Sequence, residues 1–530
     1  MKGVCWHQLS ANTFLVNCLL FLNELNESMQ KSVIEYLEKS VKAYPQKDAV
    51  QDSEMRITFS ELWDAAKRIS NAIVAVDVVK NSPIGVYIPK GCKMVESFAG
   101  INMCGCFYVP LDTKSPDARV SSILTTLEAT CVITDQAHAT QLRGFFNGNV
   151  LVIEDVIANV NPEDGDKNDV LQIDSDPVYS IFTSGSTGTP KGVVIAHRGV
   201  IDYIDWAVNT FHITSESVIG NQAPFYFDNS SLDIYLMYST GATLNIIPES
   251  CFAFPAKLVD YLNENKITFV FWVPFVLVNV ANMNILASKK PEYLKDVFFA
   301  GEVMPNKHLN YWRKHLPNCR YANLYGPTEI TVDCTYYVVE REFSDDESLP
   351  IGFPCKNSDV LILVDRKRLA KKGEQGELCV RGSSLALGYY NNPEKTIAAF
   401  VQNPLHSHYP ETIYCTGDIV YENELGEIMY VGRADAQIKH NGYRIELGEI
   451  ETAILGTNMV DNCCVVYDYA NKKIVLFYQS KEELNMAEFR KALSGSIPRY
   501  MLPNEYHREK LLKQNNSGKI DRAYYNKLFK

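Results

Sequence analysis

The stretch Tyr179-Ser-Ile-Phe-Thr-Ser-Gly-Ser-Thr-Gly-Thr-Pro-Lys-Gly192 decides the fold of this chain. It places hydroxyl residues and glycines between Thr183 and Gly188, and a cation follows at Lys191. Small residues let backbone N–H groups approach phosphate oxygens, while hydroxyls and a lysine add donors and positive charge. The residues from Val178 to Phe182 have the apolar composition of a buried strand. Open α/β sheets bind ligands where their strands end, so this stretch favours an α/β protein with a phosphate-binding loop.

The loop differs from a Walker phosphate loop, because Pro190 precedes Lys191 where that motif has a glycine. Taken alone, a loop rich in glycine, serine and threonine is more often a flexible turn than a nucleotide site. The choice between these interpretations depends on what the rest of the chain contains.

Further motifs occur along the chain in one order. They are Arg56-Ile-Thr-Phe-Ser-Glu-Leu62, Cys104-Gly-Cys-Phe-Tyr-Val-Pro-Leu-Asp112, Phe227-Asp228, Asn323-Leu-Tyr-Gly-Pro-Thr-Glu329, Gly376-Glu-Leu-Cys-Val-Arg-Gly382, Gly388-Tyr-Tyr-Asn-Asn-Pro393, Tyr414-Cys-Thr-Gly-Asp418, Gly432-Arg-Ala-Asp-Ala-Gln-Ile-Lys439, Gly442-Tyr-Arg-Ile-Glu-Leu-Gly-Glu-Ile-Glu451 and Asn516-Ser-Gly-Lys-Ile-Asp-Arg522. Together with the loop, this series resembles the motifs of the adenylate-forming superfamily: acyl-CoA synthetases, luciferases and the adenylation domains of nonribosomal peptide synthetases. The resemblance runs from about Met29 to the C-terminus.

Two segments look most like the D-alanine:carrier-protein ligases of this superfamily. They are Phe227-Asp-Asn-Ser-Ser-Leu-Asp-Ile-Tyr235 and Gly301-Glu-Val-Met-Pro305. The cysteine that those ligases carry in the substrate pocket has no match here, because the comparable positions are Val280 and Ala300. D-Alanine is therefore a candidate substrate, and the identity of the acyl group stays open at this point.

The hydrophobic pattern agrees with the α/β fold that the resemblance implies. Apolar runs at 83–88, 130–134, 266–273 and 296–300 predict strands, and residues 32–41 predict the first helix. The resemblance implies a large multi-sheet α/β domain over 29–433 and a small mobile α+β domain over 434–530, with a hinge at Asp435. Residues 1–28 are expected to be an extension. Its apolar run is shorter than the ~20 residues that cross a bilayer, so we predict no membrane span.

The resemblance implies an ATP-dependent reaction in two halves. A carboxylate attacks the α-phosphate of ATP to give an acyl-adenylate and pyrophosphate, and a thiol then displaces AMP. The implied ATP contacts are Thr183, Ser184, Gly185, Ser186, Thr187, Gly188, Lys191, Asn323, Tyr325, Gly326, Asp418 and Arg433.

Four residues carry catalytic roles by the same resemblance. Thr328 and Glu329 are expected at the α-phosphate, with Mg²⁺ bound by Glu329, since a carboxylate is the hard oxygen ligand that this ion prefers. Lys519 is expected to bridge acyl carboxylate and phosphate oxygens during adenylation. Lys439 and the segment Gly442-Tyr-Arg444 match the face of the small domain that enters for thiol transfer.

Asp228 points to an amino acid as the acyl substrate. In amino-acid-activating members of the superfamily, the aspartate at this position pairs with the α-ammonium group of the substrate. A buried carboxylate is costly without a cation, which agrees with such a substrate; an aspartate that caps a turn is the alternative. By alignment the pocket also includes Asn229, Leu232, Phe275, Phe298, Ala300, Leu324, Val332 and Asp333. Most are apolar, and Asp333 is suited to a polar or basic side chain.

Charge indicates which partners to expect. The net charge of −12 argues against nucleic acid or an anionic membrane. From Arg490 to Lys530, however, ten Lys/Arg residues face three Asp/Glu. Such a basic lobe suits an anionic partner, and a solvated charged face explains it equally well. With the resemblance, we predict a separate phosphopantetheinyl carrier protein as the thiol acceptor.

Fourteen cysteines without zinc-ligand spacing suit a reducing cytoplasm, where we place the protein. Three function classes stay open from the sequence. An amino-acid adenylating enzyme leads, an acyl-CoA ligase for a carboxylic acid without an amino group is the runner-up, and a non-catalytic nucleotide-binding protein is the third.

Overall fold

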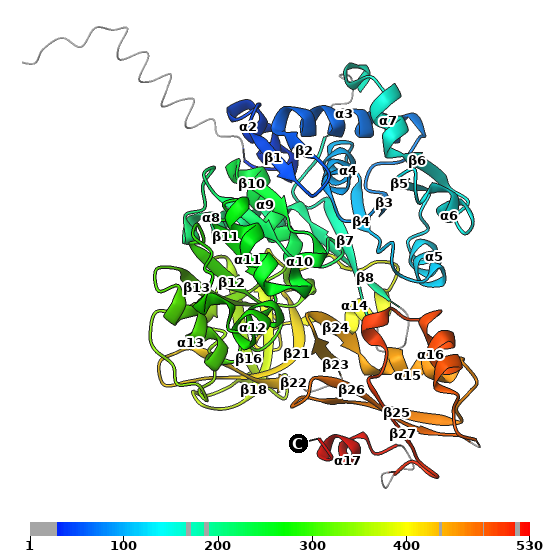
Figure 1. Cartoon of the computed structure of the whole chain (residues 1–530), viewed down its shortest axis with the longest axis vertical. Helices are drawn as coiled ribbons and strands as arrows, with labels where there is room; N and C mark the ends of the chain where they lie inside the picture. Colours follow the sequence, from blue (N-terminus) through cyan, green and yellow to red (C-terminus); the bar gives the residue numbers. More distant parts are fainter. Residues whose placement is uncertain are drawn as a thin grey trace, which may run out of the picture.

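The computed structural model describes residues 29–165, 171–184, 190–433, 437–480, 482–514 and 520–529. The predicted extension 1–28, the loop residues Gly185 to Gly188, the predicted hinge Asp435 and Lys519 lie outside these ranges. Within these ranges, no sheet contains strands from both sides of residues 434–436, so we call the part up to Arg433 the large domain and the part from Gln437 the small domain (Figure 1). The large domain combines several sheets with covering helices, which confirms the predicted α/β class.

Within the described ranges the large domain contains three β-sheets, of nine, seven and six strands. The nine-stranded sheet has the order β15 (Phe353–Pro354), β14 (Thr335–Val338), β13 (Arg320–Tyr325), β12 (Asp296–Phe299), β11 (Phe269–Trp272), β9 (Val218–Asn221), β10 (Thr243–Ile246), β1 (Asp48–Gln51) and β2 (Arg56–Thr58). The seven-stranded sheet has the order β19 (Gly388–Tyr389), β8 (Lys191–Ala196), β7 (Pro177–Thr183), β4 (Phe107–Pro110), β3 (Pro83–Tyr87), β5 (Cys131–Thr134) and β6 (Asn149–Val152). The third consists of β17 (Arg368–Leu369), β16 (Ser358–Val364), β18 (Gly376–Gly382), β21 (Thr412–Glu422) and β20 (Phe400–Gln402), with β22 (Ile428–Arg433) beside β21.

Helices cover these sheets and connect their parallel strands. In the large domain they are α2 (Val33–Ala43), α3 (Phe59–Ala75), α4 (Cys92–Met103), α5 (Asp117–Thr126), α6 (Ala139–Arg143), α7 (Ile153–Asn159), α8 (His197–Phe211), α9 (Asn229–Thr240), α10 (Glu249–Ala253), α11 (Pro255–Glu264), α12 (Pro274–Asn282), α13 (Asn306–His315) and α14 (Pro393–Ala399). Strands β9, β11, β12 and β13 are parallel neighbours, so their carboxyl ends meet at one edge of the sheet.

The secondary structure predicted from the hydrophobic pattern is confirmed. The strands expected at 83–88, 130–134, 266–273 and 296–300 are β3, β5, β11 and β12, and the first expected helix is α2. The strand β11 begins later than predicted, at Phe269. Lys266 has a φ of 50°, a left-handed conformation that ends the preceding turn and that an extended strand excludes.

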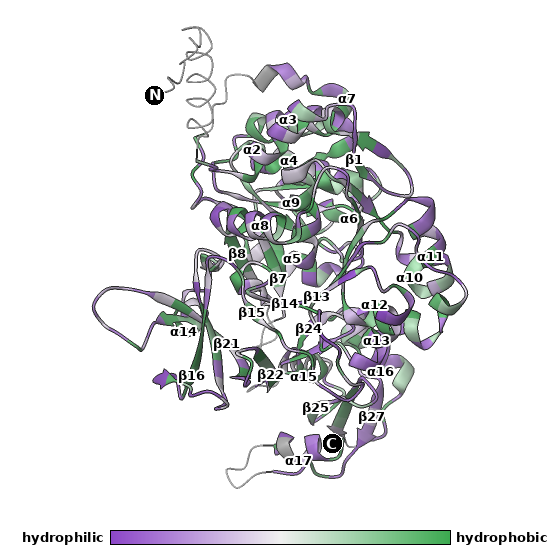
Figure 2. Cartoon of the chain, turned by 90° about the vertical axis from the view of Figure 1, so that its left-hand side faces the viewer, coloured by the Kyte–Doolittle hydropathy of each residue, from purple (hydrophilic) through white to green (hydrophobic). Residues whose placement is uncertain are grey.

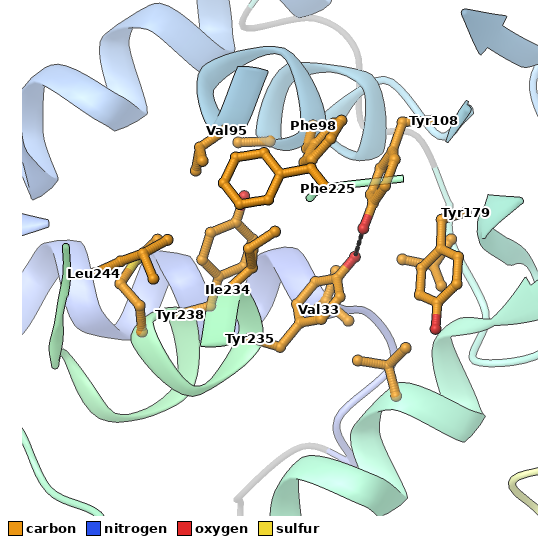
Figure 3. Packing of buried hydrophobic residues seen from close by; sticks show 14 of the residues in the cluster. Val33, Val95, Phe98, Tyr108, Tyr179, Phe225, Ile234, Tyr235, Tyr238 and Leu244 are labelled. Carbon is orange, nitrogen blue, oxygen red and sulfur yellow. Dashed lines mark hydrogen bonds between the residues drawn. The ribbon is translucent and has the colours of Figure 1, made fainter. Parts of the chain in front are cut away.

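Helix α9 is buried along most of its length. Every residue from Ser230 to Tyr238 is buried, so both flanks of the helix pack on protein. Its Tyr235 hydroxyl forms a 3.0 Å hydrogen bond with Tyr108 of β4, whose ring stacks on Phe98 of α4 (Figure 3). The hydrophobic cluster around α9 includes Ile181 of β7 and Phe271 of β11. The helix therefore joins the seven-stranded and nine-stranded sheets and fixes the position of its own N-terminus.

The small domain has its own core. It contains β23 (Gln437–His440) paired with β24 (Tyr443–Glu446), the sheet of β25 (Asn462–Asp468), β26 (Lys473–Gln479) and β27 (Glu505–Arg508), and helices α15 (Leu447–Gly456), α16 (Met486–Ser494) and α17 (Arg522–Lys527). Alternate residues of β25 face opposite sides: Cys463 and Val465 pack with α15 and α16, whereas Cys464 and Val466 pack with the α17 segment. Figure 2 shows hydrophobic stretches along strands such as β8 and β25.

The cysteines behave as small apolar residues. All twelve in the described ranges are free, and ten of these are buried.

Among the described residues no helix has the length and apolar character needed to cross a membrane.

Helices α3 and α4 cross closely at Gly100. A Cβ atom at this position would lie 2.5 Å from Ile69 Cβ and 2.9 Å from the carbonyl oxygen of Ala66. We expect Gly100→Ala to lower the free energy of unfolding by about 1–3 kcal/mol, because overpacking forces the helices apart. Urea denaturation followed by circular dichroism measures this change.

Gly432→Ala is the matched control in the same domain. Nothing lies within 4 Å of a Cβ atom at this position, so the change should stay within about 0.5 kcal/mol. Equal stability of the Gly100 variant and the wild-type protein would contradict the close crossing of α3 and α4.

Candidate functional site

A cavity of about 360 Å³ opens at the carboxyl ends of β9, β11, β12 and β13. The segments that follow these strands line it through Gln222, Val273, Ala300 and Gly326. The β23–β24 hairpin of the small domain forms another part of the wall through Lys439 and residues 441–444. Open α/β sheets place ligand sites at such strand ends, and the predicted motifs converge on this cavity.

Glu329 is fully buried beside the cavity and binds side chains from three separate segments. Its Oε1 accepts hydrogen bonds from Lys191 Nζ at 3.1 Å and from the Tyr389 hydroxyl at 2.8 Å. Its Oε2 accepts from Nη1 of Arg444, in β24 of the small domain, at 2.7 Å. Burial raises the pKa of the Glu329 carboxyl, but the charges of Arg444 and Lys191 outweigh burial and hold that pKa below its ordinary value. Glu329 is therefore an ionised carboxylate between two cations.

The predicted ribose and adenine contacts lie together, and Asp418 and Arg433 line the cavity. The Tyr325 hydroxyl donates to Asp418 Oδ2, and Nη1 of Arg433 donates to Asp418 Oδ1 at 3.0 Å. The Lys439 ammonium lies 5.9 Å from the centroid of the Tyr325 ring. Burial lowers the pKa of Lys439, and the charge of Asp418 opposes this. Each carboxylate oxygen of Asp418 keeps a second lone pair for a ligand hydroxyl.

Asp228 precedes α9 and lines the cavity. Burial raises the pKa of its carboxyl, and a hydrogen bond from the Thr328 side chain and the charge of Lys439 oppose this. Its side chain makes no capping hydrogen bond to α9, although it occupies the N-cap position. The turn-capping alternative is therefore not the role that this side chain has. The cavity wall near it is largely apolar, through Phe275, Val276, Ala300 and Val332.

Asp333 is a second acidic residue in the wall of the same cavity. Its side chain is almost fully buried, and Oδ2 accepts a 2.5 Å hydrogen bond from the Tyr203 hydroxyl. Oδ1 has no hydrogen-bond partner among the described residues. Burial raises the pKa of this carboxyl to about 8, and the nearby charge of Asp228 adds to the shift. Burial therefore favours the protonated form of this carboxyl.

The loop between β13 and β14 holds a strained backbone next to these groups. Thr331 and Val332 have φ values of 61° and 70°, which β-branched residues rarely adopt. A Cβ atom on Gly326 would lie 2.3 Å from the carbonyl oxygen of Val332 and 2.5 Å from Asp333 Cα. Glycine at position 326 is thus required by the close approach of the two chain segments. Such strain accumulates at binding sites, where surrounding packing enforces it.

Four of the predicted site residues belong neither to the cavity wall nor to the polar clusters around Glu329 and Asp418. Phe298 lies two residues before Ala300 on β12 and Leu232 lies one helical turn beyond Asp228, so both are deeper in the core, as is Leu324. The Asn323 side chain donates to the carbonyl oxygen of Pro350 at 2.8 Å and supports the neighbouring loop. The other described residues in the predicted set line the cavity or belong to the Glu329 and Asp418 clusters.

Backbone contacts join the hairpin to the large domain. The Ser184 hydroxyl, at the end of β7, donates to the carbonyl oxygen of Arg444 at 2.8 Å and accepts from the N–H of Glu446 at 3.1 Å. The N–H of Gly442 donates to Glu302 Oε1 at 2.9 Å. A Cβ atom on Gly442 would lie 2.7 Å from Val273, so glycine permits this close docking.

A buried ion pair extends the same interface. Arg119 of α5 pairs with Glu449 of α15, and the two side chains are 10% and 2% exposed. The Tyr443 ring stacks on Tyr500 at 3.7 Å and meets Phe227 edge-on at 4.9 Å. The small domain is thus docked through its hairpin face.

Residues close in sequence to Lys519 lie on the other face of the small domain. Ile520 packs with Leu512 and Tyr525 against Cys464 and Phe477, opposite to the hairpin residues of the small-domain core. The α17 segment and the hairpin therefore lie on different faces (Figure 1).

Several residues that make the contacts described above were not among the predicted catalytic, ATP-binding or substrate-binding residues. Tyr389, Arg444 and Glu302 belong to recognised motifs, so the motif match contained a signal without indicating their contacts. Arg119 and Glu449 are far apart in sequence, and no local pattern relates them.

The Arg119–Glu449 pair predicts how the docked arrangement is stabilised. Reversing either charge alone should weaken docking, because each change leaves two like charges in a buried contact. The double reversal Arg119→Glu with Glu449→Arg should restore it. The radius of gyration from small-angle scattering should increase in the single variants and return in the double variant.

The exposed pair Arg368–Glu374 provides the control, since the same reversals there lie away from the interface. Identical scattering from all Arg119 and Glu449 variants would show that this ion pair does not hold the domains together.

The raised pKa of Asp333 predicts a pH-dependent stability. A carboxyl whose folded pKa is raised above its ordinary 3.8 contributes stability that is lost as pH rises towards about 8. Asp333→Asn removes this titration and keeps the acceptor for Tyr203. Its stability relative to the wild-type protein should therefore increase steadily from pH 5 to pH 8 in urea denaturation, whereas a pH-independent difference would contradict the burial of an ionisable group here.

Comparison with known proteins identifies the family. A family model described as "AMP-binding enzyme" matches residues 37–390. The chain is 32% identical over 508 residues to D-alanine--D-alanyl carrier protein ligase of Bacillus cytotoxicus, covering 92% of this chain and 98% of that protein. It is 30% identical to Zwittermicin A synthase ZmaJ of Bacillus cereus, covering 93% and 94%. In contrast, it spans 44% of tyrocidine synthase 1 of Brevibacillus parabrevis, at 29% identity.

Solved structures share the fold. The Vibrio cholerae adenylation domain AlmE, in complex with glycyl-adenosine-5'-phosphate, matches with a TM-score of 0.79 at 20% identity, covering 95% of this chain and 98% of that chain. An artificially fused adenylation–PCP di-domain, NpsA-ThdA of Klebsiella oxytoca, matches with a TM-score of 0.78 at 20% identity, covering 91% and 94%. The predicted superfamily is confirmed: the chain belongs to the AMP-binding enzyme family and is an adenylate-forming enzyme of the type found in nonribosomal peptide synthetases.

Proposed function

We propose that this enzyme activates an amino acid with ATP as the aminoacyl-adenylate, and transfers it to the phosphopantetheine thiol of a separate carrier protein. The observation that carries this proposal is the buried Asp228 carboxylate, which lines the cavity at the strand ends beside the apolar side chains of Phe275, Val276 and Val332. Burial raises the pKa of Asp228, which means that the site lacks full compensation for its negative charge. The α-ammonium group of an amino acid supplies the missing cation.

The alternative acids fit this environment less well. A fatty or aryl acid brings no cation, so its binding would desolvate Asp228 without an ionic partner. The neighbouring Asp333 adds a second polar group, with Oδ1 free of hydrogen-bond partners among the described residues. We infer that the amino-acid side chain reaches Asp333 with a hydrogen-bonding group rather than an aliphatic one.

ATP is the nucleotide that the family uses, and the described residues suit it. Tyr325, Asp418 and Arg433 form one cluster for the nucleoside. Thr183, Ser184 and Lys191 flank the loop residues predicted to bind the β- and γ-phosphates. We assign Mg²⁺ to Glu329, whose buried oxygens have the chemistry that this ion prefers, and bound Mg²⁺ would neutralise phosphate charge. In the docked arrangement, however, both oxygens already bind cationic or hydroxyl donors.

We assign the two half-reactions to different faces of the small domain. Lys519 acts in adenylation, and Lys439 with the hairpin acts in thiol transfer, with Asp435 as the hinge between them. The separation of the α17 segment from the hairpin supports this division, because one rotation exchanges the two faces at the cavity. The basic C-terminal lobe and the carrier-protein names of the relatives support a carrier protein as acceptor.

A panel of amino acids in an ATP–pyrophosphate exchange assay tests the proposal. We expect exchange with at least one amino acid that has a polar or basic side chain, and none with fatty or aryl acids. Asp228→Asn should lower kcat/KM by about 100-fold or more, since the α-ammonium then loses its charged, partly buried partner.

Asp233→Asn is the matched control, because this neighbouring buried aspartate contacts Asn221 and does not line the cavity. Exchange that depends on fatty or aryl acids, with amino acids inactive, would replace the proposal with an acyl-CoA ligase. Lys519→Ala should abolish exchange while thiol transfer from preformed adenylate continues, and unchanged exchange would refute its assigned role.

A further inference from the structure

Two cysteines of the six-stranded sheet face each other, and neither lines the cavity. Cys379 of β18 and Cys415 of β21 are directly opposite in the antiparallel ladder. The Cys379 thiol donates a hydrogen bond to Cys415 Sγ across 3.4 Å. Opposite residues on one face of such a ladder hold their Cβ atoms about 4.5–5.5 Å apart, which is near the separation that a disulfide bridges. The two sulfurs can therefore bond while both strands stay in the ladder.

The two sulfurs differ in their surroundings. Cys415 is 7% exposed, whereas Cys379 is fully buried. The hydrogen bond from Cys379 lowers the pKa of Cys415, burial opposes this, and the positive charge of Arg366 lowers that pKa further. Thiolate character and exposure both decide which cysteine an oxidant attacks. Cys415 is therefore the sulfur that is oxidised first, and Cys379 is the thiol beside it.

The same place in the sheet is poorly suited to a metal ion. Glu377 offers an oxygen within 4.8 Å of both sulfurs, so three possible ligands are close together. Both oxygens of Glu377, however, accept hydrogen bonds from Arg366, at 2.5 and 2.8 Å. A cation would have to displace this guanidinium and bind beside its positive charge. Structural zinc sites take four ligands, and the described residues supply three here.

The cysteine pair lies beside a bulge that carries Asp418. On β18, Leu378 faces residues 416–418 of β21, which have no ladder partner in β18. Gly417 has a φ of 76°, the left-handed conformation that such a bulge uses. The Thr416 hydroxyl donates to the carbonyl oxygen of Leu378 at 2.8 Å and holds the bulge against β18. Bulges re-aim side chains next to binding sites, and this one directs Asp418 to the cavity.

A disulfide at this pair disturbs the bulge. The sulfurs lie 3.4 Å apart and must approach to about 2.05 Å when they bond. The ladder with β18 holds β21 at Tyr414 and at Val420, on either side of the bulge. The adjustment therefore falls on the residues between them, including Asp418. A displacement of about 1 Å in a site can cost as much as about 100-fold.

We propose that Cys379 and Cys415 are an oxidation site for hydrogen peroxide, and that their disulfide weakens nucleotide binding by displacing Asp418. The formation of the cross-link goes beyond the proposed function and is independent of it. The effect on the nucleotide rests on the role that the proposed function gives to Asp418. In a reducing compartment such a disulfide is transient, as redox-sensing disulfides are.

The chemistry needs peroxide as its only co-reactant. The Cys415 thiolate attacks one oxygen of hydrogen peroxide, the O–O bond breaks, and a sulfenic acid forms as hydroxide leaves. The Cys379 thiol then attacks the sulfenic sulfur, the S–S bond forms, and the sulfenic oxygen leaves as water. The proton that Cys415 lost on ionisation converts the hydroxide to water. Two thiols are thereby oxidised to one disulfide while one peroxide is reduced to water.

Peptide mapping of the wild-type protein detects the cross-link directly. Trypsin places Cys379 in the peptide 373–381 and Cys415 in the peptide 396–433, and neither peptide contains another cysteine. After treatment with hydrogen peroxide and alkylation of the remaining thiols, mass spectrometry should find these two peptides joined. Dithiothreitol should separate them again. If they stay separate at a peroxide dose that oxidises the more exposed Cys251, the inference is overturned.

Calorimetric titration with Mg²⁺ and a non-hydrolysable ATP analogue measures the consequence for the site. Oxidation of the wild-type protein should weaken binding by about tenfold or more, and dithiothreitol should restore it. Cys379→Ser and Cys415→Ser cannot form the bond, so peroxide should leave their affinity for the analogue unchanged. Cys251→Ser is the matched control, because it removes a more exposed thiol outside the pair, and it should respond like the wild-type protein.

The outcomes separate this inference from the proposed function. A cross-link that leaves the affinity for the analogue unchanged overturns the inference, and the proposed function stands. Release of a bound metal ion from the isolated protein as these two thiols become reactive overturns it in favour of a metal site. If the reduced protein neither binds the analogue nor catalyses exchange, the proposed function fails. The effect on nucleotide binding then fails with it, whereas peptide mapping still decides the cross-link.

Discussion

The buried carboxylate of Glu329 is the interaction on which the site depends. An ionised group with no exposed surface is costly unless cations and hydroxyls satisfy it, and here Lys191, Tyr389 and Arg444 do so. These partners come from β8, β19 and β24, so a single carboxylate connects two strands of the large domain to the hairpin of the small domain. The same arrangement explains why the position of the small domain and the state of the site are physically linked.

The cavity itself results from how α9 is enclosed. Because the helix is buried along its length between two sheets, its N-terminus and Asp228 are held against the ends of the parallel strands. The strained loop after β13 closes the other side, where Gly326 allows Val332 and Asp333 to approach. The carboxylates of Asp228 and Asp333 are thereby brought into the wall of one cavity.

Much of the fold and part of the site could be predicted from the sequence. Apolar runs identified strands such as β3 and β12, since strands covered on both faces leave a continuous hydrophobic pattern. Motifs identified Glu329, Asp418 and Asp228, because their chemistry requires particular residue types at fixed places in the chain. The motifs did not indicate how deeply each residue is buried. Phe298 and Leu324 were therefore expected at the cavity wall, whereas they pack in the hydrophobic core.

The sequence by itself determined the α/β class, the superfamily and the chemical groups available, because these depend on local pattern and residue identity. Only the tertiary structure decided which of those groups meet. The Arg119–Glu449 pair and the contact of Arg444 with Glu329 join segments from different domains. Such contacts follow from how two separately folded units dock, and no periodicity or motif spacing in the chain encodes that geometry. The contact between Ser184, in the phosphate stretch, and the hairpin of the small domain is therefore seen only in the tertiary structure.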